Sequence, residues 1–508
     1  MASCIMLQGT ASHVGKSILT TALCRIFLQK GRHVVPFKAQ NMSLNSYVTI
    51  DGKEMGRAQV AQAEAAGLLP DVDMNPVLLK PTGNATSQVI IHGLARGIMS
   101  ARDYHKKYAL HAFSAVQDSL LRLQAAFDTI VIEGAGSPAE VNLKDQDIVN
   151  MRVAKYLQAP VLLIADIDRG GALASIVGTL ELLEPDERAL IQGLIINKFR
   201  GDVSLFTPAI DFLEQKTNKP VLGVIPFLEN LGIEEEDSVS LEDVSLCPKA
   251  DKHIHIAVIR LPKISNFTDF SAFSIEPDVQ VFYTQEAAHL FQADLIIIPG
   301  SKNTAEDLQW LHRHRLDIAL QQALAKQIPI IGICGGYQML GEKIVDPKRT
   351  ESEVGCIDGL GILPITTTFC KQKKMAQVRG ICRSFPFLGK ALPQQCVQGY
   401  EIHHGQSYTD KFDATLITLD LQQTQKPYIV GMARADGMVW GTYLHGIFDE
   451  DGFRRNLLNE LRQRKGFMRL PLTRSYRVEK ERAYDRLAMH VRTYLQMDKI
   501  YRIMAGGM

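Results

Sequence analysis

Short apolar runs alternate with helix-like segments along most of the chain. In the first half these runs lie at residues 5–8, 34–37, 127–132, 161–165, 193–196 and 220–227, and they stop at glycines or polar residues. Runs of this length predict buried β-strands, and the segments between them, such as 18–29 and 56–66, have the spacing of helices. Buried strands separated by helices pair in parallel, so the pattern predicts an α/β fold with a doubly wound parallel sheet.

A second set of apolar runs follows a polar, acidic stretch that extends from Glu234 to about residue 251. These runs lie at 253–259, 294–298, 328–331 and 439–444, and they predict a second α/β domain. The acidic stretch has no apolar periodicity, which is typical of a linker. We therefore expect domains at residues 1–250 and 251–452, followed by a C-terminal helical tail at 453–508.

The tail is the most basic part of the chain, with 14 Lys or Arg against five Asp or Glu. A basic tail is compatible with nucleic-acid binding. However, Leu487, Val491 and Leu495 recur at helical spacing, which predicts a helix with one buried face. We favour a packed helix and expect no nucleic-acid partner.

The first strand leads into a glycine loop that ends in Gly-Lys-Ser and opens a helix. Gly9, Thr10, Gly15, Lys16 and Ser17 form this loop. Backbone N–H groups at such a turn bind phosphates, the lysine adds positive charge, and the serine hydroxyl can ligate Mg²⁺. The order of strand, loop and helix therefore predicts ATP binding, and the glycine spacing, one residue longer than usual, resembles the dethiobiotin synthetase group of P-loop enzymes.

Polar residues follow three other strands of the first domain, where ligands bind in open α/β sheets. Lys38 is a candidate for contacting a substrate carboxylate or a transferring phosphate. Glu133 is a candidate Mg²⁺ ligand opposite Ser17, because a hard cation prefers oxygen ligands. Asn197 is a candidate for contacting the adenine edge of ATP.

The motif Gly332-Ile-Cys334-Gly335-Gly has the form of a nucleophile elbow between a strand and a helix. Glycines next to the cysteine permit the strained turn that exposes its side chain. A helix N-terminus after the cysteine favours the thiolate and offers N–H groups to an oxyanion. A buried structural cysteine is the alternative. The elbow is the better interpretation if a histidine is available, and His445, after the run at 439–444, can serve as the acid–base group.

Six motifs together resemble the cobyric acid synthase family, the glutamine-dependent amidases of the cobalamin pathway. They are GTASHVGKS, PFKAQNMSLNS, GRAQVAQAEAA, MNPVLLKPTG, VIEGAGSPAEVNLKDQDIVN and ADIDRGGALAS. The resemblance extends from about Ile5 to the end of the chain. The chain departs from the family at His13, where an acidic residue is common, and at Ala39, where proline is common.

The resemblance implies a class I-like glutamine amidotransferase domain, with several roles for its residues. Gly300 and Ser301 would supply oxyanion N–H groups together with Gly335, and Glu401 would hold glutamine or orient the site. Class I enzymes carry a Glu two residues after the histidine, but Ile447 occupies that position here. We therefore expect a Cys334–His445 dyad.

The family also implies the reaction. It uses ATP and Mg²⁺ to amidate side chains b, d, e and g of adenosylcobyrinic a,c-diamide. Two alternatives remain: the related enzyme that amidates side chains a and c, and a partition-type P-loop ATPase, which would leave Cys334 and His445 without a role.

Composition is that of an ordinary globular protein. The 508 residues are 46% hydrophobic and 22% charged with a net charge of +1, which gives no argument for nucleic acid or an anionic membrane. No apolar run is long enough to span a bilayer, the N-terminal residues lack signal-peptide features, and the eight cysteines form no CxxC pair. We expect a cytoplasmic protein with small-molecule substrates, and the sequence leaves its oligomeric state open.

Overall fold

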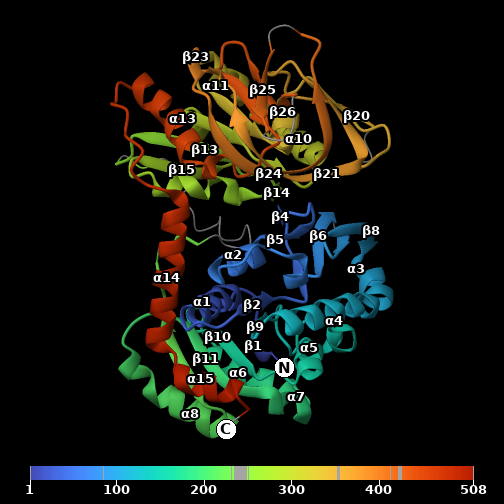
Figure 1. The fold of residues 1–508 in the computed structure, drawn as a ribbon, viewed down its shortest axis with the longest axis vertical. Helices are drawn as coiled ribbons and strands as arrows, with labels where there is room; N and C mark the ends of the chain where they lie inside the picture. The colour runs from blue at the N-terminus through green and yellow to red at the C-terminus, as the bar shows by residue number, and fades with distance from the viewer. Residues whose placement is uncertain are drawn as a thin grey trace. The chain divides into compact units, whose positions relative to one another are not determined.

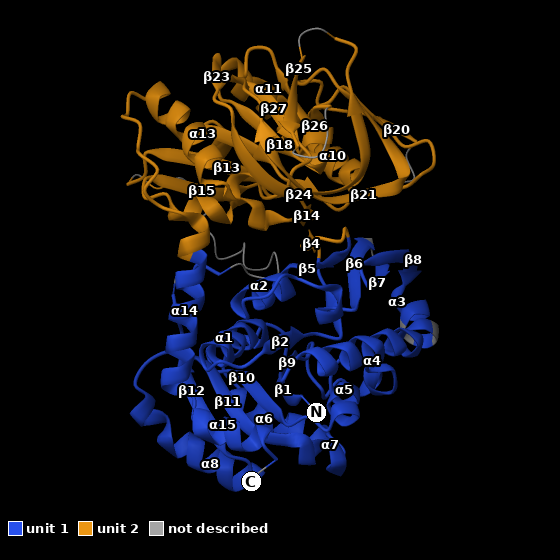
Figure 2. Cartoon of the chain, in the orientation of Figure 1, with its two compact units in different colours: residues 1–43, 53–236, 480–508 blue, residues 44–52, 237–479 orange. Residues whose placement is uncertain are grey.

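The computed structural model describes residues 2–83, 85–229, 231–233, 249, 251–351, 355–411, 414–421 and 426–506. The chain forms two compact units: unit 1 contains residues 1–43, 53–236 and 480–508, and unit 2 contains 44–52 and 237–479 (Figure 2). This division differs from the predicted one, because residues 44–52 belong to the second unit and the C-terminal region is shared between both. The predicted acidic linker lies almost entirely outside the described residues.

Unit 1 is organised around a six-stranded parallel sheet in the order β12-β11-β10-β1-β9-β2 (Figure 1). The strands are β1 (Ser3–Gly9), β2 (Val34–Phe37), β9 (Thr129–Glu133), β10 (Val161–Asp166), β11 (Ile191–Phe199) and β12 (Val221–Pro226). The predicted parallel α/β sheet is therefore confirmed. A smaller sheet has the order β3-β6-β7-β8, with β3 at Gln40–Met42, β6 at Val77–Gly83, β7 at Thr86–Ile91 and β8 at Leu94–Ser100.

Helices connect these strands and complete the unit 1 core. They include α1 (Lys16–Gln29), α2 (Arg57–Ala65), α4 (Ala109–Ala126), α5 (Met151–Leu157), α6 (Ala172–Leu182), α7 (Pro185–Leu190) and α8 (Thr207–Thr217). The C-terminal helices are α14 (Tyr476–Tyr494) and α15 (Met497–Met504). Leu487, Val491 and Leu495 are buried in the same core as the first strand and α1, so the predicted apolar face of the tail helix is confirmed.

Unit 2 contains an eleven-stranded mixed sheet among its described residues. Its parallel part has the order β15-β13-β16-β18-β27, with β13 at Ile254–Ile259, β15 at Val279–Thr284, β16 at Leu295–Ile298, β18 at Ile330–Ile333 and β27 at Val439–Thr442. The sheet continues through β26 (Tyr428–Arg434), β25 (Ala414–Asp420), β21 (Thr366–Cys382), β19 (Lys343–Val345) and β20 (Cys356–Asp358). The long strand β24 (Gln395–Tyr408) pairs antiparallel with β21.

Helices pack beside the parallel part of this sheet and form one apolar core with it. They include α10 (Thr304–Arg313), α11 (Leu316–Ala325), the short α12 (Gly335–Leu340) and α13 (Asp451–Arg464). Within the described residues of both units, no helix combines the length and apolarity needed to cross a bilayer.

Candidate active sites

The predicted phosphate-binding loop joins β1 to α1. β1 ends at Gly9, and the N–H of Thr10 donates to a carbonyl oxygen of β10 at 2.9 Å. Gly15 is the N-cap of α1 with φ 100°, a backbone conformation that glycine adopts without strain. Lys16 is buried, and its Nζ donates to two backbone carbonyl oxygens at 2.9 and 3.0 Å. The loop residues are thus held together at the carboxyl end of the central strand.

A buried ion pair lies beside this loop. Lys38 Nζ and Glu133 Oε1 are 2.8 Å apart, and both side chains are buried. Ser17 Oγ donates to the same carboxylate oxygen at 2.9 Å, and Gln62 Nε2 donates to the other at 2.6 Å. Burial alone would raise the pKa of Glu133, but the charge of Lys38 and the three hydrogen bonds outweigh it and hold that pKa below its usual value. The structure therefore brings three predicted residues together and adds Gln62.

Asn197 lies against the loop through its amide. Its Nδ2 donates to the carbonyl oxygen of Val14 at 2.8 Å, and a Cβ on Gly15 would lie 2.1 Å from that nitrogen. The neighbouring Lys198 donates through Nζ to the carbonyl oxygen of His13 at 2.7 Å. Asn197 thus contacts the loop backbone directly, which sequence analysis did not predict. Its contact with adenine stays a prediction.

The donor set beside Lys16 fits a hard cation. Ser17 Oγ and Glu133 Oε1 are 2.9 Å apart, so both oxygens can face one ion. Among the described residues no group of three or more His, Cys, Asp or Glu forms a metal cage. Mg²⁺ does not need such a cage, because it commonly uses one or two protein oxygens together with substrate phosphates and water.

In unit 2, Cys334 occupies a strained turn between β18 and α12. Its φ is 51° and its ψ is −107°, a conformation that non-glycine residues rarely adopt. Gly332 and Gly336 permit this turn. A Cβ on Gly332 would lie 2.6 Å from Leu340 Cδ1, and one on Gly336 would lie 2.0 Å from the Ile298 carbonyl oxygen. Backbone strain held by close packing at a nucleophile is typical of an elbow.

His445 lies beside Cys334 and is held by a carboxylate that sequence analysis missed. Its side chain interacts electrostatically with that of Cys334. Its Nδ1 is 2.7 Å from Asp269 Oδ2, and the other oxygen of Asp269 accepts the Gly446 N–H at 3.0 Å. With Nδ1 engaged by Asp269, Nε2 is left to face the cysteine. The structure thus places a third residue, Asp269, against the predicted Cys334–His445 dyad, while Ile447 stands where class I enzymes carry a Glu, and the catalytic roles of these residues stay a prediction.

This arrangement favours a charged imidazole. Complete burial alone would lower the pKa of His445, but the charges of Asp269 and of the Cys334 thiolate, with a hydrogen bond to each, raise it to about 10. At neutral pH His445 is therefore an imidazolium beside Asp269 and Cys334. Such a group stabilises a thiolate nucleophile and can give its proton to a leaving amine.

The predicted oxyanion loop lies against the elbow. Gly300 and Ser301 form β17, which pairs antiparallel with Ser265 and its neighbour in β14 (Ile264–Ser265). A Cβ on Gly335 would lie 2.9 Å from the Ser301 nitrogen, so the backbones of the loop and the elbow are in close contact. Ser301 Oγ donates to Asp307 Oδ2 at 2.6 Å, and burial raises the pKa of Asp307 to about 6. Asp307 thus anchors the loop, another contact that sequence analysis did not predict.

Glu401 is fully buried on β24, but it lies in a different group of charges. Lys374 Nζ is 3.0 Å from its Oε2, Tyr428 donates a hydrogen bond to that oxygen, and His403 Nε2 is 3.7 Å from its Oε1. Burial alone would raise the pKa of Glu401, and these neighbours outweigh it and lower the pKa. Next along the strand, the Ile402 carbonyl oxygen is 3.8 Å from Cys334 Sγ. The carboxylate that contacts His445 is therefore that of Asp269 and not that of Glu401, and a contact between Glu401 and glutamine stays a prediction.

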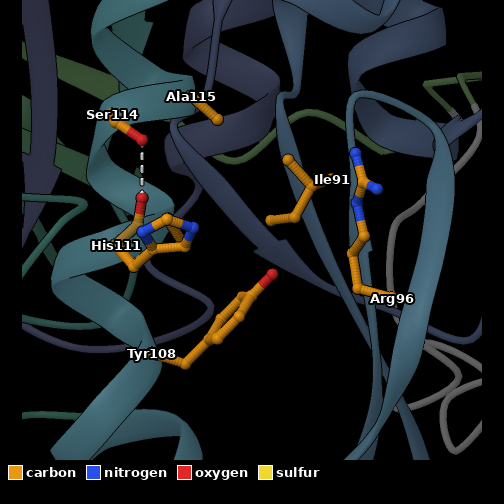
Figure 3. A pocket seen from close by; sticks show the side chains of 7 residues that line it. Ile91, Arg96, Tyr108, His111, Ser114 and Ala115 are labelled. Atoms are coloured by element: carbon orange, nitrogen blue, oxygen red, sulfur yellow. Dashed lines mark hydrogen bonds between the residues drawn. The ribbon is translucent and has the colours of Figure 1, made fainter.

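A further cavity of about 310 Å³ lies in unit 1 between β7, β8 and α4. Ile91, Arg96 and Tyr108 line it together with one face of α4, on which Ser114 Oγ donates to the His111 carbonyl oxygen at 2.7 Å (Figure 3). None of the predicted site residues lines this cavity.

Asp269 could not be identified from the sequence, because it belongs to no motif of fixed spacing. It lies 176 residues before His445, on the 3₁₀ segment Phe267–Ile275, whereas the expected carboxylate position is two residues after the histidine. The sequence signal is weak, because Asp269 lies in a stretch after the first strand of unit 2 where phenylalanines at every third position alternate with several polar residues.

Comparisons with known proteins match both parts of the chain. The family model for the CobQ/CobB/MinD/ParA nucleotide binding domain matches residues 5–240, and the model for the CobB/CobQ-like glutamine amidotransferase domain matches residues 255–453. A cobyric acid synthase from Moorella thermoacetica is 52% identical over 99% of this chain and 98% of its own length. The enzymes of that name from Pelotomaculum thermopropionicum and Yersinia enterocolitica are 51% and 49% identical over 99% and 98% of this chain, and over 97% and 98% of their own lengths. The chain therefore belongs to the cobyric acid synthase family of glutamine-dependent amidating ligases.

Proposed function

We propose that this enzyme amidates carboxylates b, d, e and g of adenosylcobyrinic a,c-diamide, with ATP as the activating substrate and glutamine as the nitrogen donor. One observation carries the proposal. A single chain combines a P-loop beside the buried Lys38–Glu133 pair with a strained cysteine beside a histidine–aspartate pair. An enzyme that releases ammonia and activates an acid needs both groups, and the relatives that match over nearly the whole chain carry the name of such an enzyme.

In unit 2 the cysteine attacks the side-chain amide carbon of glutamine. Backbone N–H groups of Ser301 and Gly335 stabilise the oxyanion that forms. His445 then gives its proton to the departing nitrogen, the C–N bond breaks, and ammonia leaves a Cys334 thioester. Water attacks this thioester while His445 takes up a proton, which releases glutamate and restores the thiolate.

In unit 1 a substrate carboxylate oxygen attacks the γ-phosphorus of ATP, ADP leaves, and an acyl phosphate forms. Lys16 and Lys38 neutralise negative charge on the transferring phosphate. Ammonia then attacks the acyl carbon and loses a proton. The bond between that carbon and the bridging oxygen breaks, and inorganic phosphate leaves with the oxygen. The activation is necessary because a carboxylate is a poor electrophile, whereas phosphate is a good leaving group. Ser17 and Glu133 would hold Mg²⁺, which would supply further charge neutralisation at the phosphates.

Incubation with ATP, Mg²⁺, glutamine and each candidate corrinoid, followed by mass spectrometry, tests this proposal. We expect four amidations of adenosylcobyrinic a,c-diamide. Two amidations of cobyrinic acid would instead identify the related a,c-diamide synthase. ATP hydrolysis without glutamine hydrolysis would identify a partition-type ATPase, an alternative that the Cys334–His445–Asp269 geometry disfavours.

A further inference from the structure

Residues 44–52 belong to unit 2, although unit 1 precedes and follows them in the chain (Figure 2). The segment contains the short strand β4 (Ser46–Val48). Val48 is completely buried and packs with Tyr400 and Ile402 of β24, and Tyr47 packs against the same cluster. The segment is therefore an integral part of the amidotransferase unit.

Two buried hydrogen bonds tie Ser46 to the rest of unit 2. Its N–H donates to Asn266 Oδ1 at 3.0 Å, and its carbonyl oxygen accepts from the Tyr400 hydroxyl at 3.1 Å. The Tyr47 ring also lies 5.0 Å from the Tyr400 ring, between centroids. Leaving buried polar groups without partners is unfavourable, so a displacement of Ser46 would displace Asn266 and Tyr400 as well.

The same two partners enclose the catalytic imidazole. The Tyr400 ring stacks on the His445 ring at 5.1 Å and 20°, and the two residues exchange backbone hydrogen bonds of 3.1 and 2.9 Å. Asn266 Nδ2 lies 3.5 Å from both ring nitrogens of His445. The Asn266 carbonyl oxygen also accepts the N–H of Asp269 at 3.0 Å. Both anchors of Ser46 are thus positioned to set the orientation of His445.

The segment is a direct continuation of the substrate-facing part of unit 1. Lys38, eight residues before Ser46, forms the buried ion pair with Glu133, which in turn accepts a hydrogen bond from Ser17 of the phosphate loop. A nucleotide or a corrinoid carboxylate that engages Lys38 or Ser17 must change this set of contacts. The covalent chain from Lys38 to Ser46 connects this set of contacts with Asn266 and Tyr400.

We propose that residues 44–52 couple the state of the nucleotide-binding unit to glutamine hydrolysis, with Asn266 and Tyr400 acting as positioning residues for His445. The inference rests on the proposed function for the ligands that act at Lys38 and Ser17. Its consequence is that ammonia is released faster when an acceptor is ready, which limits wasteful hydrolysis of glutamine.

Glutamate release measured with and without ATP, Mg²⁺ and corrinoid tests the coupling. In the unmodified enzyme these ligands should raise the kcat of glutamate release by about 10-fold or more, a tenfold rate change being well above the error of the assay. Tyr400→Phe removes only the hydroxyl that binds Ser46, and it should abolish this stimulation while KM for glutamine stays unchanged. Asn266→Gly should do the same, because glycine tolerates the φ of 54° at that position. Tyr408→Phe, at an exposed tyrosine at the end of the same strand, is the matched control and should behave as the unmodified enzyme.

Amidation with ammonia in place of glutamine shows whether each variant is folded and active in unit 1, and it should be unchanged. The coupling is refuted if the unmodified enzyme shows no stimulation, or if both variants keep it. It is also refuted if the variants lose ammonia-dependent and glutamine-dependent amidation equally, because that result indicates a general structural role. If the unmodified enzyme amidates no corrinoid from either nitrogen source, the proposed function fails, and stimulation of glutaminase by ATP and Mg²⁺ alone still decides the coupling.

Discussion

Replacing Asp269 with asparagine tests the amidotransferase site most specifically. Asparagine preserves the size of the side chain but removes the charge that lies 2.7 Å from His445 Nδ1. Burial then acts on the imidazole without its main opposing charge and lowers the pKa of His445. The amide can also present its NH₂ group to Nδ1, which would place the remaining imidazole proton on Nε2 in the wrong tautomer for Cys334.

The magnitude follows from the environment of His445. Its pKa rises from 6.5 to about 10, and at 1.36 kcal/mol per unit this corresponds to about 5 kcal/mol in favour of the charged form. Asp269 is the largest of the contributions that raise this pKa. Loss of the orienting carboxylate in a Ser–His–Asp enzyme lowers kcat by about 10⁴-fold, so we expect a decrease on the order of 10²- to 10⁴-fold in glutaminase kcat for Asp269→Asn.

Glutamate release between pH 6 and 10.5 measures both effects. In the unmodified enzyme kcat/KM should fall with rising pH near pH 10, where His445 loses its proton. In the variant this fall, the basic limb of the pH profile, should occur at lower pH, because His445 loses its proton more easily without the charge of Asp269. Asp317→Asn is the matched control, since Asp317 Oδ2 lies 2.9 Å from His312 Nδ1 in the same unit and neither residue belongs to the site. An Asp269→Asn enzyme with the kcat and basic limb of the Asp317→Asn enzyme would refute the orienting role of Asp269.

Further predictions concern the two sites separately. Cys334→Ala should abolish glutamate release and leave ammonia-dependent amidation intact. Glu133→Gln should lower ammonia-dependent amidation by about 10²-fold or more, because Lys38 loses its buried counter-charge, while glutamine hydrolysis without ATP persists. Gly336→Ala should cost about 1–3 kcal/mol of unfolding free energy, measured by denaturant titration, because its Cβ would lie 2.0 Å from a carbonyl oxygen. The raised pKa of His445 stabilises the fold fully below pH about 6.5, and thermal unfolding should show this contribution decline as pH rises to about 10.

The strands, and the loops whose conformation depends only on neighbouring residues, could be predicted from local sequence patterns. The P-loop and the cysteine elbow were predictable because each is a single strand–turn–helix unit, in which glycine positions report the backbone conformation. The burial of Leu487, Val491 and Leu495 was predictable because helical spacing alone determines which residues share a face.

Contacts between distant parts of the chain were not predictable in this way. Asp269 reaches His445 across 176 residues, and Gln62 reaches Glu133 across 71 residues, so sequence spacing carries no information about either contact. The assignment of residues 44–52 to unit 2 was missed for the same reason: a polar segment after a strand gives no sign of where it packs. Asn197 followed the predicted strand, but only the structure places its amide on the loop backbone.

The central claim is that Cys334 releases the nitrogen that an ATP-dependent reaction transfers to a corrinoid carboxylate. Mass spectrometry of adenosylcobyrinic a,c-diamide, after incubation with ATP, Mg²⁺ and glutamine labelled with ¹⁵N in its side-chain amide, tests this claim most directly. We predict four labelled amides with the unmodified enzyme and none with Cys334→Ala, which should still form four unlabelled amides from ammonium. Labelled product from the Cys334→Ala enzyme, or no amide from the unmodified enzyme, would contradict the account.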